Sequence, residues 1–326
     1  MAEIRYNWTK QEVLEIYNLP LLELVHRAGV VHRQHHDPLE VQVSSLLSIK
    51  TGGCVEDCAY CPQAARYHTD VEVHKLLPLT EVIEAAKNAK KGGASRFCMG
   101  AAWREVRDNS DFDKVLEMVR EVNSLNMEVC CTLGMLTEEQ AKKLDEAGVY
   151  AYNHNVDTSE EHYNDIITTR TYEDRLDTIK NVRKTGMTVC SGGIIGMGES
   201  VEDRIGMLIT LSAMEPHPES VPVNALVPIE GTPLADQPTV SSWEMIRMVA
   251  TTRVVLPEAA VRLSAGRGQM SKEAQAMCFM SGANSIFAGD KLLTTPNPEF
   301  NEDMQLFKDL GITAKEPVQR RAAVEA

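Results

Sequence analysis

Three cysteines lie close together in the sequence, with the spacing C-x3-C-x2-C at Cys54, Cys58 and Cys61. Cysteine thiolates are the usual protein ligands of iron-sulfur clusters, and every iron of a cubane cluster needs a ligand. A compact loop that offers three thiolates leaves one iron without a nearby protein ligand. The spacing therefore predicts a [4Fe-4S] cluster with an open iron, to which a small molecule could bind.

Two other interpretations of the same cysteines stay open. A tetrahedral zinc site would need a fourth Cys or His close by, and His68 is the nearby candidate. A ferredoxin-like electron carrier uses C-x2-C-x2-C with a remote fourth cysteine before a proline. Pro62 does follow Cys61, but the longer first spacing and the length of the chain fit a small carrier poorly.

A second metal-binding pattern is formed by His32, His35 and His36, whose i, i+3, i+4 spacing would place them on one helix face. The chain breaks directly afterwards at Asp37-Pro38, among polar neighbours. We therefore interpret the three histidines as part of a polar surface turn.

The composition is that of a folded globular protein. Of the 326 residues, 43% are hydrophobic and 25% are charged, which is enough for a full core. The net charge of -14 argues against nucleic acid and anionic membranes as partners, because both need a basic footprint, and it favours a small-molecule substrate. No export signal and no long apolar run occurs, which predicts a cytoplasmic protein. In a reducing compartment, its eight cysteines are expected to be thiols or metal ligands rather than disulfides.

Short apolar or β-branched runs alternate with helix-like stretches along most of the chain. Eight such alternations without a second type of composition predict an α/β fold, a closed (β/α)8 TIM-type barrel. An open doubly wound sheet is the alternative. The predicted strands are 41–49, 95–99, 127–132, 149–155, 187–192, 220–226, 260–264 and 285–288.

The predicted barrel occupies residues 41–312. Before it, residues 1–40 have a helical period interrupted at Pro20, which predicts an N-terminal extension of two short helices joined by a bend. After it, residues 313–326 are polar and rich in alanine, and we expect a disordered tail.

Active sites of such barrels lie at the carboxyl ends of the strands. Three predicted strands end in cysteine, at Cys98, Cys130 and Cys190. One buried cysteine on a strand is usually a small apolar residue, but three at matching positions favour a shared function. Cys131 follows Cys130 directly, so the two point to opposite faces and one of them can face the barrel interior. Cys278, in a helix-like stretch, is predicted to belong to the core.

The cysteine loop resembles the signature of the radical S-adenosylmethionine enzymes, in which this cofactor chelates the open iron of a [4Fe-4S] cluster. More narrowly, the chain resembles the biotin synthase family over about residues 20–298. The segments that carry this resemblance are VQVSSLLSIKTG at 41–52, RFCMGAAW at 96–103, YNHNVD at 152–157, TTRTY at 168–172, VCSGG at 189–193, VRLSAGR at 261–267 and LLTTPNP at 292–298.

The resemblance implies a second cluster, [2Fe-2S], deep in the barrel, with Cys98, Cys130, Cys190 and Arg262 as ligands. Arginine is an unusual ligand, since the guanidinium group stays protonated and has no lone pair to give. From the residues alone, Arg262 would be a charge partner inside the barrel. The family pattern has one cysteine at this position, so Cys131 is additional. The ligand is assigned to Cys130, because its spacing in the sequence from Thr132-Leu133-Gly134 matches the family pattern.

The resemblance also implies small-molecule contacts. S-adenosylmethionine would be bound by Tyr60, Asn155, Asp157, Arg175 and Ile194. Dethiobiotin would be bound by Asn153, Asn155, Asn224, Thr294 and Thr295. Carboxylates accept from ribose hydroxyls, and uncharged amides suit a neutral cyclic urea. An alternative for Asp157 is that it caps the helix that follows.

The implied reaction inserts sulfur into dethiobiotin to give biotin, with a 5′-deoxyadenosyl radical from S-adenosylmethionine abstracting hydrogen and the [2Fe-2S] cluster donating sulfur. The protein would be a sulfurtransferase in which cofactors carry the radical chemistry, so no side chain is assigned a catalytic role. The implied partners are an electron donor such as flavodoxin or ferredoxin, and a second copy in a homodimer.

Two other functions compete with this one. Lipoyl synthase also inserts sulfur, but it would need a further cysteine cluster near the N-terminus, and residues 1–53 contain no cysteine. An iron-sulfur carrier or redox sensor would not need the polar strand ends at Asn153, Asn155, Asp157 and Asn224.

Overall fold

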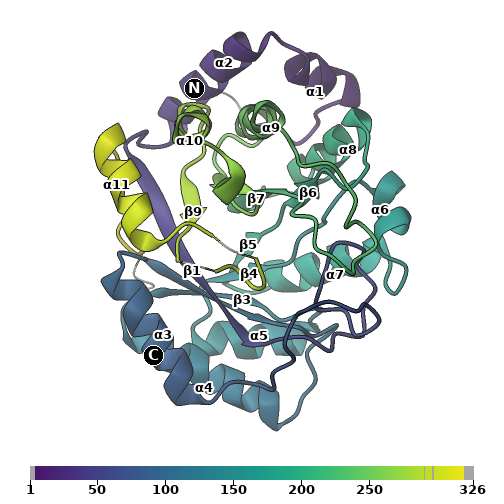
Figure 1. Cartoon of the computed structure of the whole chain (residues 1–326), viewed down its shortest axis with the longest axis vertical. Coiled ribbons are helices and arrows are strands. Elements are labelled where there is room, and N and C mark those ends of the chain that lie inside the picture. The colour runs from purple at the N-terminus through teal and green to yellow at the C-terminus, as the bar shows by residue number, and fades with distance from the viewer. Residues whose placement is uncertain (1–3, 290, 296, 319–326) are drawn as a thin grey trace.

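The computed structural model describes residues 4–289, 291–295 and 297–318. In this part of the chain, eight parallel strands close into a barrel, because β9 pairs with β1 as well as with β8 (Figure 1). Each predicted strand run overlaps one of them, so the predicted (β/α)8 barrel is confirmed and the open sheet is wrong. The barrel strands are β1 (Glu40–Lys50), β2 (Arg96–Ala101), β3 (Glu128–Thr132), β4 (Ala151–Asn153), β5 (Thr188–Cys190), β7 (Ser220–Ala225), β8 (Ala260–Leu263) and β9 (Ser285–Phe287).

The fifth predicted strand, 187–192, contains β5, and a separate β6 (Gly193–Ile195) follows directly after it; both pair with β7. The break falls at Gly192, where a Cβ atom would lie 2.1 Å from the carbonyl oxygen of Pro222. Only glycine allows the two backbones to approach this closely. The break lets the chain after Cys190 change direction beside the mouth of the barrel.

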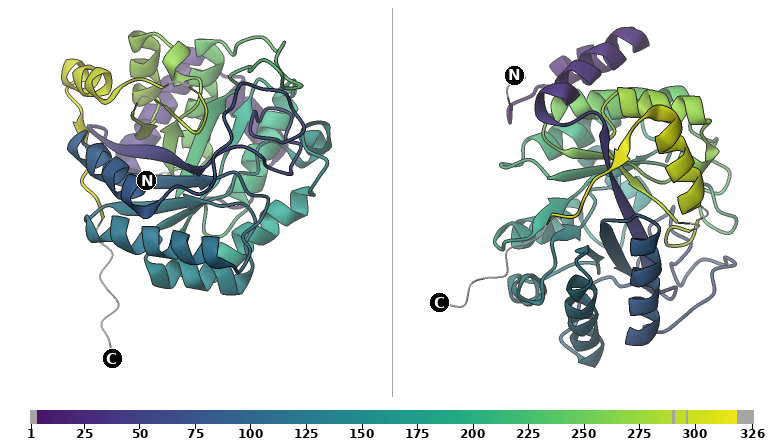
Figure 2. Two further views of the ribbon diagram at one scale, coloured as in Figure 1. Left: turned by 60° about the horizontal axis from the view of Figure 1, so that its bottom comes forward. Right: turned by 90° about the vertical axis from the view of Figure 1, so that its left-hand side faces the viewer.

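Helices surround the barrel, as Figures 1 and 2 show. Capping boxes begin two of these helices: the side chain of Thr137 accepts from the N–H of Gln140 at the start of α5, and that of Ser241 accepts from the N–H of Glu244 at the start of α9. The surrounding helices are α3 (Leu79–Lys91), α4 (Ser110–Ser124), α5 (Glu138–Ala147), α6 (Glu160–Ile166), α7 (Tyr172–Arg183), α8 (Val201–Ser212), α9 (Ser242–Val255), α10 (Lys272–Met280) and α11 (Phe300–Leu310).

Two helices precede the barrel, α1 (Lys10–Tyr17) and α2 (Leu21–His35), and Pro20 separates them as expected. They pack against α8 and α9 through an apolar face. The predicted polar surface turn at the histidines is wrong, because α2 continues through His35 and His32 is buried. His36 also faces inward, with its Nε2 2.9 Å from a guanidinium nitrogen of Arg253 on α9.

The chain end is ordered further than expected. Thr313–Ala314 form β10, which pairs in parallel with the start of β1, so the predicted disordered tail does not begin at residue 313 (Figure 2). This segment is ordered because its backbone pairs with β1. Without β10, the hydrogen-bonding groups at the start of β1 would face water. Residues 319–326 of the predicted tail lie outside the described residues.

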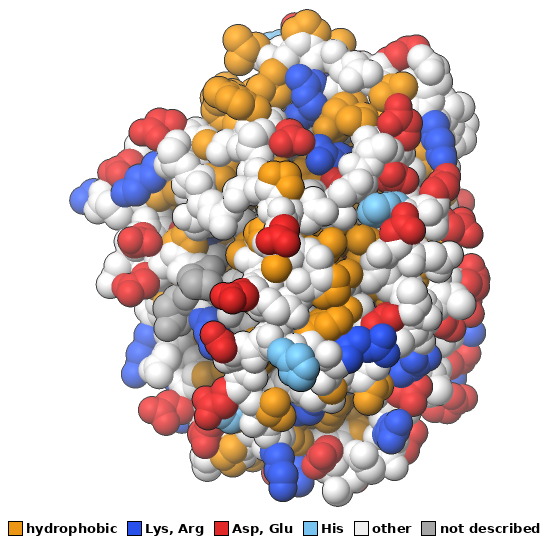
Figure 3. Space-filling model, turned by 45° about the vertical axis from the view of Figure 1, so that its right-hand side comes forward, with side chains coloured by type: hydrophobic (Ala, Val, Ile, Leu, Met, Phe, Trp, Pro, Cys, Tyr) orange, Lys and Arg blue, Asp and Glu red, His pale blue; other side chains and the backbone are white. Residues whose placement is uncertain are grey.

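Acidic side chains are spread over the face in Figure 3, in keeping with the net charge of -14. Apolar side chains gather at its upper end, where Figure 1 shows the N-terminal helices. Among the helices of the described residues, none combines the length and the apolar character that a membrane crossing requires.

Candidate active site

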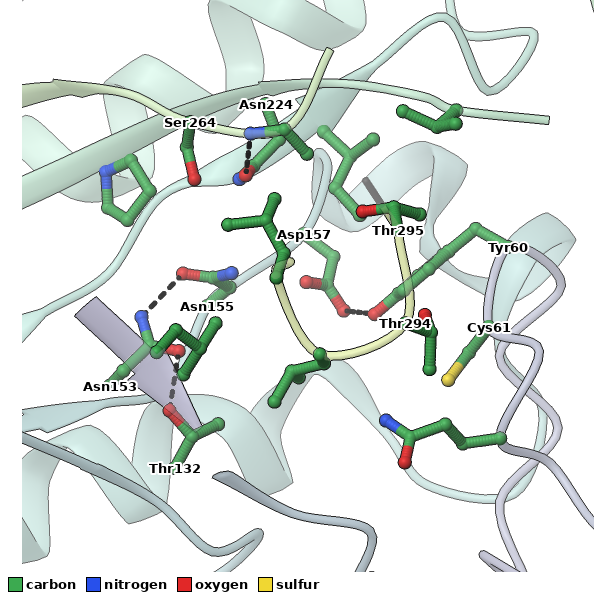
Figure 4. Close-up of a pocket in the computed structure, with 18 of the residues that line it drawn as sticks. Tyr60, Cys61, Thr132, Asn153, Asn155, Asp157, Asn224, Ser264, Thr294 and Thr295 are labelled. Carbon is green, nitrogen blue, oxygen red and sulfur yellow. Dashed lines mark hydrogen bonds between the residues drawn. The ribbon is translucent and has the colours of Figure 1, made fainter. Parts of the chain in front are cut away.

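A cavity of about 330 Å³ opens at the carboxyl ends of the barrel strands. Its wall includes Cys61 and Tyr60 from the cysteine loop, and Cys98 and Cys130 from β2 and β3. Asparagines and threonines complete the wall from other elements (Figure 4). The structure thus brings the loop cysteines and the strand-end cysteines to one cavity. The predicted small-molecule contacts that also line it are Asn153, Asn155, Asp157, Arg175, Ile194, Asn224, Thr294 and Thr295.

The cysteine loop follows β1 and folds back on itself. The N–H of Cys54 donates to the carbonyl of Gln63 at 3.0 Å, and the N–H of Ala65 donates to the carbonyl of Cys54 at 2.7 Å. The N–H of Cys61 donates to the carbonyl of Cys58 at 2.9 Å. These backbone bonds hold Cys54, Cys58 and Cys61 in one compact turn, and none of the three is in a disulfide.

Asp57, between the first two cysteines, ties this loop to the segment before α7. Its carboxylate accepts from the N–H groups of Thr168 and Thr169 at 2.9 and 3.1 Å, and from the hydroxyl groups of both threonines. Burial alone would raise the pKa of Asp57, but these hydrogen bonds outweigh burial and lower the pKa to about 2. Asp57 is therefore ionised at neutral pH and fixes the position of the loop.

Cys58 and Cys61 are neutral thiols in the protein alone. Burial raises the pKa of Cys58 to about 11 and that of Cys61 to about 12. Metal ligation requires thiolates, so the positive charge of bound iron would have to deprotonate both groups. This disulfide-free set of thiols, of which Cys58 is buried and Cys54 and Cys61 are half-buried, is a donor set that fits an iron-sulfur cluster.

The described residues do not show the ligand geometry of a single metal ion. Across residues 4–289, 291–295 and 297–318, no three His, Cys, Asp or Glu side chains converge as they would around one ion. In an iron-sulfur cluster each terminal thiolate binds its own iron, so the cysteines stand further apart. The loop of Cys54, Cys58 and Cys61 is compatible with that wider arrangement.

A second group of thiols lies deeper in the barrel. Cys98 and Cys130 are directly opposite each other on β2 and β3, and their side chains are hydrogen-bonded. Cys190, at the end of β5, is buried beside them, with its Sγ 3.8 Å from a guanidinium nitrogen of Arg262. The three thiols and the guanidinium group therefore surround one position inside the barrel, and they could hold a cluster together.

Arg262 is held by polar groups that sequence reasoning missed. Its Nε donates to Ser285 at 2.9 Å, and a terminal nitrogen donates to Gln42 at 3.3 Å and to Ser44 at 3.4 Å. Among the described residues no carboxylate pairs with it, so the thiols and these neutral polar groups are what its charge faces. A signal for these partners was present in the sequence. Gln42 and Ser44 are two residues apart on β1, and residues two apart share one face of a strand.

The neighbouring cysteines Cys130 and Cys131 point to opposite faces, as alternation requires. Cys130 lines the cavity, whereas Cys131 is buried in the apolar core between the barrel and its helices. Cys278 lies in that core too, as predicted, and burial raises its pKa to about 12.

Asp157 connects the cysteine loop to α7. Its Oδ2 accepts from the hydroxyl of Tyr60 at 2.8 Å and pairs with the guanidinium group of Arg175 (Figure 4 shows the Tyr60 contact). Burial and the Asp157 carboxylate raise the pKa of Tyr60, so this phenol remains a donor. The alternative role of Asp157 as a helix cap is wrong, because Ser159 caps α6.

Asparagine side chains link the cavity to the deeper thiols. The amide nitrogen of Asn153 lies 3.1 Å from Asn155 Oδ1 and 3.3 Å from Cys190 Sγ, and its oxygen accepts from Thr132 at 3.2 Å. Asn224 stands across the cavity (Figure 4), and its amide nitrogen donates to the carbonyl of Gly193 at 2.9 Å. Asn153 thus touches both the open cavity and a thiol of the second group.

Two family models match this chain: the radical SAM superfamily over residues 48–211, and the biotin and thiamin synthesis associated domain over residues 222–313. The barrel and its cysteine loop therefore belong to a radical SAM protein. A biotin synthase from Cytophaga hutchinsonii is 66% identical over 97% of this chain and 94% of its own length, and one from Nostoc sp. is 58% identical over 98% and 97%. The chain belongs to the biotin synthase family.

Solved structures with low sequence identity share the fold. Methylornithine synthase superimposes with a TM-score of 0.79 at 18% identity, covering 95% of this chain and 94% of that chain. An FeFe-hydrogenase maturase from Carboxydothermus hydrogenoformans gives a TM-score of 0.80 at 16% identity, covering 94% of this chain and 76% of that chain. At these identities the likeness concerns the architecture alone.

Proposed function

We propose that this protein is a biotin synthase, a sulfurtransferase that converts dethiobiotin to biotin. The observation that carries the proposal is the shared cavity, whose wall contains Cys61 of the surface loop together with Cys98, Cys130 and Arg262 from inside the barrel. A reaction that uses a radical from one cluster and sulfur from another needs both beside one substrate. The family membership of the chain supports the same assignment.

Two sets of residues would hold the iron-sulfur groups. Cys54, Cys58 and Cys61 would ligate a [4Fe-4S] cluster, and the set of Cys98, Cys130, Cys190 and Arg262 would ligate a [2Fe-2S] cluster. When bound, these groups and S-adenosylmethionine supply the electron, the radical and the sulfur of the reaction. The protein supplies position and a shielded cavity.

The contacts of S-adenosylmethionine would lie between the cysteine loop and α7. Asp157 already accepts from Tyr60 and pairs with Arg175, so its carboxylate is held toward the cavity. Its remaining lone pairs could accept from ribose hydroxyls. Asn155 and Ile194 line the same side. These residues would orient the cofactor toward the open iron.

Dethiobiotin would lie between the cysteine loop and the deeper set of thiols formed by Cys98, Cys130 and Cys190. Its neutral urea could bind the amides of Asn153 and Asn224, each of which offers a donor and an acceptor. Thr294 and Thr295, on the segment after β9, line the same cavity and could hold the carboxylate tail. Leu46 and Phe287 supply apolar wall near the deeper thiols, where they would help to exclude water from the substrate.

We further propose that the electron comes from a carrier such as flavodoxin or ferredoxin, that two copies form a homodimer, and that the protein works in the cytoplasm. Family membership supports the first two proposals. All eight cysteines are free thiols, which is compatible with a reducing compartment.

The test is biotin production from dethiobiotin by anaerobically reconstituted protein, with S-adenosylmethionine and dithionite. Iron and sulfide counts should match a cubane plus a [2Fe-2S] cluster. Selective loss of the second cluster should leave S-adenosylmethionine cleavage intact and abolish biotin formation. Full biotin yield without that cluster would refute its role as sulfur donor, and one cubane with no biotin would favour the iron-sulfur carrier.

A further inference from the structure

Three arginines line the active-site cavity: Arg170, Arg175 and Arg262. The nitrogens of Arg175 are engaged, because Nε donates to the hydroxyl of Tyr163 at 2.8 Å and a terminal nitrogen pairs with Asp157. The other terminal nitrogen donates to a backbone carbonyl at 2.7 Å. Arg262 is engaged deeper in the barrel by the polar groups described above. Neither of these two arginines has a nitrogen to spare for a ligand.

Arg170 differs from the other two in its hydrogen bonding. Its side chain is 9% exposed, and its Nε is buried without a hydrogen-bond partner among the described residues. The carboxylate of Glu56 is close, but its Oε2 lies 3.9 Å from Nε, which is too long for a hydrogen bond. A buried charged group needs a close partner of opposite charge to offset its lost hydration. Arg170 is therefore the cavity arginine that can still donate to a bound molecule.

Glu56 does not balance the charge of Arg170, because this carboxylate serves two arginines. Its Oε1 lies 3.5 Å from Nε of Arg104, and its Oε2 accepts from the hydroxyl of Thr169. One carboxylate and two guanidinium groups leave a net positive charge. Of the two arginines, Arg170 lines the active-site cavity and Arg104 lines a separate groove. The group thus presents positive charge to the cavity through Arg170.

The backbone before Arg170 is fixed to the cysteine loop. Asp57 of the loop accepts from the N–H groups of the two residues that precede Arg170. The charge of Arg170 also reaches Cys58, since burial raises the pKa of this thiol to about 11 while the charges of Arg175 and Arg170 oppose the rise. Arg170 is thus held within electrostatic range of a predicted ligand of the loop cluster.

We propose that Arg170 binds the carboxylate group of a small molecule in the active-site cavity. The inference rests on the proposed function, because S-adenosylmethionine and dethiobiotin each carry one carboxylate. A guanidinium group can bind a carboxylate through two parallel charge-assisted hydrogen bonds, one of them from Nε. The position of Arg170 beside Cys58 favours the carboxylate of S-adenosylmethionine, and that of dethiobiotin is the second source.

The test measures equilibrium binding to the anaerobically reconstituted protein without reductant, so that S-adenosylmethionine is not cleaved. The probes are S-adenosylmethionine, its decarboxylated form, dethiobiotin and dethiobiotin methyl ester. Arg170→Met should weaken the binding of one probe that carries a carboxylate at least tenfold, because a charge-assisted pair is lost. It should leave the matching probe without a carboxylate unchanged. Loss for S-adenosylmethionine alone identifies the methionyl carboxylate, and loss for dethiobiotin alone identifies its tail.

Two further variants complete the test. Arg170→Lys keeps the charge but not the paired donors, so its affinity should lie between wild type and Arg170→Met. Arg66→Met is the matched control: Arg66 also pairs with a loop carboxylate, Asp57 at 3.4 Å, but it is 52% exposed and is not among the described residues that line the cavity. It should leave all four affinities unchanged.

The role of Arg170 has clear outcomes that would overturn it. Unchanged affinities in Arg170→Met and Arg170→Lys would do so, and so would equal losses for a probe and its partner without the carboxylate, because a purely structural role affects both probes. The expected binding pattern in a wild-type protein that forms no biotin would instead refute the proposed function and leave the role of Arg170 standing.

Discussion

One oxygen of Asp57 accepts hydrogen bonds from both the backbone N–H and the hydroxyl group of Thr169, at 3.1 and 2.9 Å. The two residues are 112 positions apart in the chain. Asp57 lies within the cysteine loop, and Thr169 precedes α7, which carries Arg175. The contact therefore fixes the predicted cluster loop relative to the predicted cofactor contacts.

Asp57→Asn should destabilise the protein by about 2 kcal/mol, since a charge-assisted acceptor of several hydrogen bonds is lost. Urea denaturation of the cluster-free protein measures this difference. The lowered pKa of about 2 adds a pH dependence. The stabilisation is complete above the unfolded-state pKa, about 3.9, and it is lost as the pH falls toward the folded-state pKa. The gap between wild type and variant should therefore shrink from pH 6 to pH 2, and a constant gap would contradict this assignment.

Cys130→Ala and Cys131→Ala form a matched pair on opposite faces of β3. Cys130→Ala should lose the [2Fe-2S] absorption and biotin formation while S-adenosylmethionine cleavage continues. Cys131→Ala should keep both clusters and cost about 1 kcal/mol of stability, because a small group leaves the packed core. Visible spectra and sulfide counts measure whether each variant keeps the [2Fe-2S] cluster. Loss of the cluster in Cys131→Ala alone would reverse the assignment.

Arg262→Met removes the guanidinium group from Ser285, Gln42 and Ser44. Their buried polar atoms lose a partner, which should cost about 1–3 kcal/mol in the free energy of unfolding of the cluster-free protein. In the reconstituted protein, the visible spectrum of the second cluster should shift, because its surroundings at Cys190 change. The spectrum of the loop cluster serves as the internal control. Identical spectra and stability would exclude both roles of Arg262.

Asp157→Asn leaves Arg175 buried without a carboxylate. Removal of one partner of a buried ion pair typically costs about 3–5 kcal/mol, and this loss should be seen in thermal denaturation. The KM for S-adenosylmethionine should rise at least tenfold, while the KM for dethiobiotin changes little. Asn224→Ala should show the converse pattern. If both variants alter the same KM, the division of the cavity proposed above is incorrect.

The barrel and the positions of its thiols could be predicted, because alternating patterns and the strand-end rule depend on local sequence. The alternation of side chains along a strand is likewise enough to place Cys130 and Cys131 on opposite faces. The hydrogen-bond partners of Arg262 could not be predicted as easily, because Gln42 and Ser285 come from strands more than 200 residues apart in the sequence. The burial of His32 also depends on distant residues, through the packing of α2 against α9, which no local pattern contains.

The backbone N–H of Val318 donates to Oε1 of Glu128 at 2.8 Å, and the other carboxylate oxygen contacts Arg96 and Gln42. Gln42 in turn accepts from Arg262. A shortened chain that ends before β10 would lose this donor to Glu128 and the pairing of β10 with β1. For protein engineering, Val318 and β10 thus belong to the hydrogen-bond network that reaches Arg262 through Glu128 and Gln42, and a truncation should leave them in place.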